Sequence, residues 1–145
     1  MRSVLGVIVA LVTMVVVVSA VSVAPWFVLG VDAVLKPGSF DTTTSYSAIA
    51  LVAAALGGLI GGGICSAITR SRTAVYVLAV LSLVGGMTNV VGQARKPQPG
   101  PRAPGLTVME AVTQRKEPMW FTLVIPCLGV LGVLRGGQRA RNTVG

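Results

Sequence analysis

Residues 3–31 read SVLGVIVALVTMVVVVSAVSVAPWFVLGV and contain no charged side chain. The apolar core of this stretch, residues 4–24, is long enough to cross the hydrocarbon of a bilayer, which takes about 20 residues in a helix. A strand of the same composition could not cross alone, because its backbone amides would have no hydrogen-bond partners in lipid. The stretch therefore predicts a membrane-spanning α-helix.

A cleaved signal peptide is the alternative interpretation of this stretch. Arg2 would supply the positive n-region, and Val18-Ser19-Ala20 or Ser22-Val23-Ala24 could serve as the cleavage site. The apolar run is longer than the roughly 7–15 residues of an h-region, and this length favours an uncleaved span.

Further charge-free stretches divide the rest of the chain. They predict spans over residues 46–68, 73–94 and 118–135, a polar loop over 95–117 and a frayed tail over 136–145. The predicted fold is all-α: one membrane domain covering residues 1–145, built as an integral membrane four-helix bundle. A short extra-membrane helix is expected in the loop between the third and fourth spans.

The composition excludes several classes of function. Only 11% of the residues are charged and 53% are hydrophobic, whereas a soluble domain carries about a quarter charged residues. The chain has no histidine, so it cannot supply a His-ligated metal site or a His general base by itself. Cys65 and Cys127 lie in apolar stretches without metal-binding spacing, and we interpret Glu110 and Glu117 as surface charges. We expect no catalytic residue, no metal site and no cofactor, and therefore no enzyme.

The net charge of +8 does not indicate nucleic-acid binding. The Lys and Arg residues flank the apolar spans, where they would face phospholipid headgroups. With the N-terminus inside, each side carries six of them, but the inner six fall on very short segments, which dominate the positive-inside rule. We expect a bacterial inner (cytoplasmic) membrane protein with both termini cytoplasmic. Trp26, Tyr46 and Trp120 would form an aromatic belt at the outer interface.

Small residues recur every four positions in the second span. The row consists of Ala54, Gly58, Gly62 and Ser66, and Ser82 and Gly86 repeat the spacing in the third span. Small side chains let helix backbones approach closely in lipid, where packing drives association. The spacing predicts helix-packing surfaces, with either an internal helix or a second copy as the partner.

The predicted spans contain no Asp, Glu, Lys or Arg except Arg135, which is the last residue of the fourth span. Transporters and proton pumps usually place such a residue along their pathway. Asn89 is the amide best placed within a span, and we expect it to hydrogen-bond a neighbouring helix. A contact with a substrate is the alternative.

The polar loop contains a helix-start signal at Thr107-Val108-Met109-Glu110, which fits the capping box T-x-x-E. It predicts a short helix from about Thr107 to Glu117 that ends before Pro118. Val108, Met109 and Val112 would share one face, with Arg115 near the C-terminal end, and we expect a partner to dock on these residues. A merely solvated linker is the alternative.

Four segments together resemble small bacterial four-span membrane proteins of uncharacterised function. They are residues 1–12, Thr69-Arg70-Ser71-Arg72, Gly85-Gly86-Met87-Thr88-Asn89 and Pro118-Met119-Trp120-Phe121. The resemblance implies the four-span topology and no particular activity. An acidic residue late in the first span, frequent in such proteins, is absent here.

These observations favour a small non-catalytic membrane protein. We expect an accessory or packing subunit of a membrane complex, or a homo-oligomer, whose partners are the lipid bilayer and other membrane chains or itself. A transporter or channel-like protein for a small neutral or lipidic solute is the alternative. No nucleic-acid partner is expected.

Overall fold

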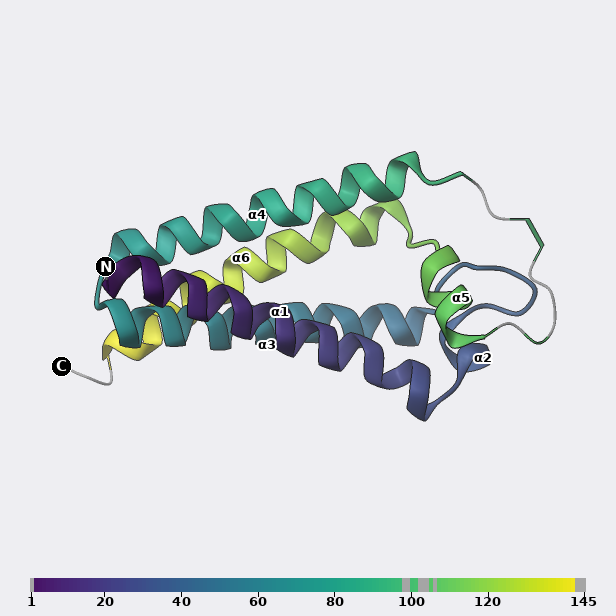
Figure 1. The fold of residues 1–145 in the computed structure, drawn as a ribbon, viewed down its shortest axis with the longest axis horizontal. Helices are drawn as coiled ribbons and strands as arrows, with labels where there is room; N and C mark the ends of the chain where they lie inside the picture. The colour runs from purple at the N-terminus through teal and green to yellow at the C-terminus, as the bar shows by residue number, and fades with distance from the viewer. Residues whose placement is uncertain (1, 98–99, 102–104, 106, 143–145) are drawn as a thin grey trace.

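A computed structural model describes residues 2–97, 100–101, 105 and 107–142. Its helices are α1 (Arg2–Val28), α2 (Val31–Val34), α3 (Thr44–Thr69), α4 (Arg72–Arg95), α5 (Val108–Gln114) and α6 (Met119–Asn142). The four long helices form a bundle, with the start of α1 and the end of α6 at one end and α2 and α5 at the other (Figure 1). The predicted all-α four-helix bundle is thereby confirmed. Each long helix has the length and composition to cross a membrane.

The link between α3 and α4 is a tight turn. Arg70 adopts a left-handed conformation with φ of 51°, and its N–H donates to the carbonyl of Ser66 at 2.9 Å. This geometry terminates α3, because a left-handed residue caps the last carbonyls and reverses the chain. Helix α4 begins at Arg72, so α3 and α4 are joined by only two residues and run antiparallel.

One small-residue row of α3 faces α6. A Cβ atom added to Gly58 would lie 3.1 Å from Cα of Gly132, and one added to Gly62 would lie 2.8 Å from Cα of Val133. The contact at Gly62 is shorter than real Cβ contacts, and a Cβ on Gly58 would also clash with the carbonyl of Gly129, so only glycine fits at this separation of the two backbones. Helices α3 and α6 therefore meet backbone against backbone.

The adjacent row of α3 faces α1. A Cβ on Gly61 would lie 3.2 Å from Cβ of Met14, and one on Gly57 would lie 2.5 Å from Cγ2 of Val18. Here the side chains of α1 pack against the glycines of α3. The two rows, offset by one residue, thus place α3 between α6 and α1.

The C-terminal segment is helical where we expected a frayed tail over 136–145. Helix α6 continues to Asn142, and residues 143–145 lie outside the described part. Gly136 lies against the carbonyl of Leu59, and a Cβ on Gly137 would be 2.7 Å from Cγ1 of Val75. The prediction was wrong for residues 136–142 because these glycines pack the segment onto α3 and α4.

Residues 29–43 and 107–118 form a small cap on the end of the bundle that carries α2 and α5 (Figure 1). Its buried cluster consists of Trp26, Val34, Leu35, Phe40, Tyr46 and Ala111. The rings of Trp26 and Tyr46 meet edge to face, with centroids 5.7 Å apart. Both side chains are buried, whereas Trp120 is 55% exposed. The expected aromatic belt is therefore wrong for Trp26 and Tyr46, which hold the cap to α1 and α3.

Candidate functional site

A groove of about 520 Å³ lies between α1 and α4 and is floored by α3 and α6. Figure 1 shows that α1 and α4 both begin at the end of the bundle that holds the N-terminus, where they lie close together, and that they diverge toward the cap. Its lining is mainly apolar and includes five branched aliphatic side chains: Leu11, Val15, Val18, Leu81 and Ile125. The divergence of the two helices leaves this groove open at the side of the bundle.

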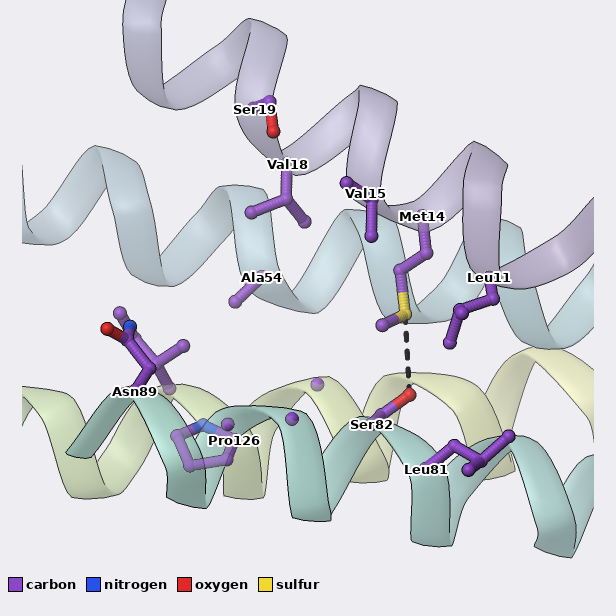
Figure 2. A pocket seen from close by; sticks show the side chains of 14 residues that line it. Leu11, Met14, Val15, Val18, Ser19, Ala54, Leu81, Ser82, Asn89 and Pro126 are labelled. Carbon is purple, nitrogen blue, oxygen red and sulfur yellow. Dashed lines mark hydrogen bonds between the residues drawn. The ribbon is translucent and has the colours of Figure 1, made fainter. Parts of the chain in front are cut away.

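Ser82 is the polar residue nearest the narrow end of the groove. Its hydroxyl donates to the carbonyl of Leu78 at 2.8 Å and lies 3.8 Å from the sulfur of Met14 on α1 (Figure 2). The hydroxyl is satisfied within its own helix, so Ser82 bridges α4 and α1 through a weak contact. A small side chain here keeps the two helices close.

Asn89 lies farther along α4, where the groove is wide (Figure 2). The side chain is exposed, and within the described residues it makes no hydrogen bond to a neighbouring helix. An amide without a partner is costly in hydrocarbon. The helix-to-helix hydrogen bond that we expected for Asn89 is not made inside this chain.

Asn89 shares an open stripe of α4 with Gly85 and Gly92, which lie four residues before it and three after it. Residues at these spacings lie on one face of a helix. A Cβ added to Gly85 or Gly92 would meet nothing within 4 Å. These two glycines were not among the predicted packing residues, because the sequence does not reveal whether the space beside a glycine is filled.

The other small residues selected from the sequence lie inside the bundle. Ala54 and Ser66 are buried on α3, in the row whose Gly58 and Gly62 face α6. Gly86 of α4 lies against the ring of Pro126 on α6. These positions therefore pack against helices of the same bundle, and Ala54 and Gly86 also line the groove.

The predicted helix in the polar loop is α5, and its capping box is present. The hydroxyl of Thr107 accepts from the N–H of Glu110, and the Glu110 carboxylate accepts from the Thr107 N–H at 3.1 Å. The Thr107 hydroxyl, followed by its backbone N–H, lowers the pKa of Glu110. The helix is shorter than expected and ends at Gln114.

The four residues proposed for partner docking do not form one free surface. Val108 and Val112 pack against the cluster of the cap, while Met109 is 76% exposed. Arg115 donates to the hydroxyl of Tyr46 at 2.8 Å. The four residues therefore share no single free face, because the two valines and Arg115 turn toward the bundle. Docking of a partner on these residues stays a prediction.

Glu117 is buried, which corrects its interpretation as a surface charge. Its carboxylate lies 3.2 Å from Arg115 and its side chain is 4% exposed. The guanidinium compensates a charge that would otherwise be costly to bury. Arg115 thus joins Glu117 to Tyr46 and holds α5 beside the start of α3.

A second pocket, of about 470 Å³, lies where the cap meets the ends of α4 and α6. Its walls include Lys36, Lys96 and Lys116 together with Asp41 and Glu117. The three lysines come from separate loops, so no local pattern in the sequence signals that they meet. Along the described residues, no three His, Cys, Asp or Glu side chains gather where they could hold a metal ion.

Comparison with known proteins adds no relative. No protein-family model matches the sequence, and no curated protein or solved structure is significantly similar to it. The resemblance to small four-span membrane proteins therefore stays a prediction, and the function has to be argued from the groove and the α4 stripe.

Proposed function

We propose that the protein is a non-catalytic, multi-span membrane protein that acts as an accessory subunit by packing α4 against a helix of another membrane chain. The observation that carries the proposal is the open stripe of Gly85, Asn89 and Gly92. It combines two glycines whose added Cβ atoms would meet nothing within 4 Å with an amide that has no hydrogen-bond partner among the described residues.

The open glycines of α4 differ from the glycines of α3, which pack against another helix of the same chain. Gly58 and Gly62 are needed because α6 occupies the space beside them. Glycine in a helix otherwise costs up to about 1 kcal/mol relative to alanine, because its backbone loses more conformational freedom on folding and it has no side chain to pack. Gly85 and Gly92 carry that cost although no described residue occupies the space beside them. A helix of another chain could approach closely through that space.

The amide of Asn89 favours a protein partner over lipid chains. An acyl chain has no donor or acceptor, so lipid packed on α4 would leave the amide unsatisfied. A second copy of this chain is a fitting partner, because an asparagine carries both donor and acceptor and two copies related by a twofold axis can pair their amides. A different chain with a polar side chain at the same depth would serve equally.

The membrane setting belongs to the same proposal. All described long helices are apolar enough to span a bilayer. Arg2, Arg70 and Arg72 lie at the end of the bundle opposite the cap, and short arginine-bearing segments favour the cytoplasmic side. We propose that both termini are cytoplasmic and that the cap lies outside, in a bacterial inner membrane.

A second candidate function is the binding or passage of a small neutral or lipidic solute. The groove favours it, because a space of about 520 Å³ with aliphatic walls is within the size range of small-molecule sites. Asn89 would then hydrogen-bond the solute. In the first function the Asn89 amide bonds to another protein chain, and in the second it bonds to a solute. Variants of Asn89 therefore distinguish the two functions.

The test is the composition of the particle in mild detergent, measured by mass spectrometry of the intact complex. We expect masses of two copies of the 14.8 kDa chain, or of this chain with another membrane chain in fixed ratio. Gly85→Leu and Asn89→Leu should release the partner, while Met87→Leu, an exposed position on another face of α4, should not. A monomer that retains a small molecule in an Asn89-dependent manner would instead support the solute-binding function, and a bare monomer would contradict both.

A further inference from the structure

We propose that the pocket lined by Lys36, Lys96 and Lys116 binds the phosphate of an anionic phospholipid. We call it the lysine pocket; it measures about 470 Å³. This inference rests on the proposed membrane location of the protein. It does not depend on association through α4, because the pocket lies at the cap and not on the Gly85–Asn89–Gly92 stripe.

The charge of the lysine pocket is positive despite two acidic residues in its walls. Arg115 compensates the Glu117 carboxylate at 3.2 Å. Among the described residues, no ion pair joins Lys36, Lys96 or Lys116 to an acid within 4.0 Å. The walls of the pocket therefore carry three lysines against the one uncompensated carboxylate of Asp41, and an anion is the ligand that this charge balance attracts.

The backbone around the lysines is fixed before any ligand arrives. The N–H of Lys36 donates to the carbonyl of Asp41 at 2.9 Å, and the N–H of Lys116 donates to the carbonyl of Phe40 at 2.9 Å. The ammonium of Lys96 donates to the carbonyl of Thr113 at 3.3 Å, which ties the end of α4 to α5. A site that is already ordered loses less entropy when it binds.

The position of the pocket identifies a lipid as the source of the phosphate. Lys96 directly follows α4, and Pro118 and Met119 stand at the start of α6. The pocket thus lies where two apolar helices leave the span, which is the level of phospholipid headgroups. Its apolar wall, formed by Ala94, Pro118 and Met119, continues onto helices that acyl chains would contact.

Gln93 adds a second polar feature to the pocket wall. Its Oε1 atom is buried and makes no hydrogen bond in the described structure, although an unpaired buried acceptor is costly. A rotation of the Gln93 side chain toward the pocket would let this oxygen accept a hydrogen bond from a headgroup hydroxyl, and that bond would remove the cost. The ligand class that fits both features is an anionic phospholipid whose headgroup also carries a hydroxyl, such as phosphatidylglycerol.

The experiment compares lipid retention by the full-length chain in nanodiscs and after transfer to mild detergent. The probes are bilayers of phosphatidylcholine alone and of phosphatidylcholine with phosphatidylglycerol. We expect preferential retention of phosphatidylglycerol, reduced about fivefold for each of Lys36→Gln and Lys116→Gln. Arg72→Gln and Arg95→Gln remove the same charge outside the pocket and should leave the preference unchanged.

Two results would overturn the proposal. Equal loss in the arginine and lysine variants would show general attraction between a basic protein and an anionic surface. Binding of inorganic phosphate with the same lysine dependence, and no preference between the two bilayers, would make the ligand a free phosphate and not a lipid.

Folding and insertion are measured separately for each variant by circular dichroism and by flotation with phosphatidylcholine vesicles. Lys36→Gln is at an exposed position, so it supplies a readout even if Lys116→Gln misfolds. A chain that floats but shows no lipid preference contradicts the lysine pocket alone. A chain that does not float contradicts the membrane location on which the pocket depends.

Discussion

At the scale of the residue, glycine has two opposite roles in this bundle. Gly62 lies against the backbone of Val133, where a Cβ atom would be 2.8 Å from Cα. Gly129 of α6 is also in a helix, but a Cβ added there would meet nothing within 4 Å. Replacement of glycine by alanine therefore tests helix packing at Gly62, and at Gly129 it tests only the change in backbone conformational entropy.

We predict that Gly62→Ala destabilises the protein by about 1–3 kcal/mol, because the added methyl group clashes with a backbone that cannot rotate away. The gain in helix propensity, up to about 1 kcal/mol, is too small to offset the clash. Gly129→Ala is the matched control and should be neutral or slightly stabilising. Thermal unfolding in detergent measures both, and equal tolerance would contradict the close contact of α3 with α6.

At the scale of the element, α5 is a helix of 7 residues that is short enough to depend on its cap and its packing. The Thr107–Glu110 capping box satisfies N–H groups at its start. Ala111 is fully buried in the cluster of the cap. Loss of the capping box should therefore loosen α5 without disturbing the four long helices.

We predict that Thr107→Ala costs about 1 kcal/mol of local stability, the usual cost of removing an N-cap side chain. Hydrogen exchange of the amides of α5 should accelerate, while that of α3 stays unchanged. Thr113→Ala, within the same helix, is the control, because its hydroxyl bonds only to the preceding turn at Met109. Unchanged exchange in Thr107→Ala would mean that packing alone orders α5.

The same capping box makes α5 sensitive to acid. The pKa of Glu110 is lowered by the Thr107 hydroxyl and backbone N–H, so the folded state favours the carboxylate. Its contribution is present above the pKa of the unfolded state and is lost as the pH falls through the lowered pKa of the folded state. Exchange in α5 should accelerate over that acidic range, and Glu110→Gln should remove the pH dependence.

At the scale of the whole molecule, the two ends of the bundle are chemically different. One end carries the two-residue link between α3 and α4, which consists of Arg70 and Ser71 and is followed by Arg72. The other end carries the cap, with its lysine pocket and the Arg115–Glu117 ion pair. This asymmetry is the basis for the proposed orientation.

We predict that the cap faces outward and that the link at Ser71 faces the cytoplasm. In a chain with Cys65 and Cys127 replaced by alanine, a membrane-impermeant thiol reagent applied to intact cells should label Gly100→Cys. It should label Ser71→Cys only after the membrane is permeabilised. The reverse pattern would invert the topology, and an N-terminal tag lost from the mature chain would indicate cleavage of the first helix.

The sequence by itself determined the four long helices and the start of α5. Apolar length and the need to satisfy every backbone amide are properties of continuous segments, so residues 4–24 and 46–68 predict helices without knowledge of their neighbours. The Thr107–Glu110 box is equally local. The row of Gly58 and Gly62 predicted close packing, but the spacing did not reveal whether α6, another helix or another chain would fill it.

The tertiary structure alone decided which groups meet across long separations in the chain. It buried Glu117 beside Arg115, drew Tyr46 into the cap and continued α6 past residue 135. It also left Asn89 without a hydrogen-bond partner among the described residues, and it placed three lysines spread from residue 36 to residue 116 around one pocket. Each outcome depends on the crossing and divergence of helices, which side-chain contacts over the whole bundle determine and no local pattern encodes.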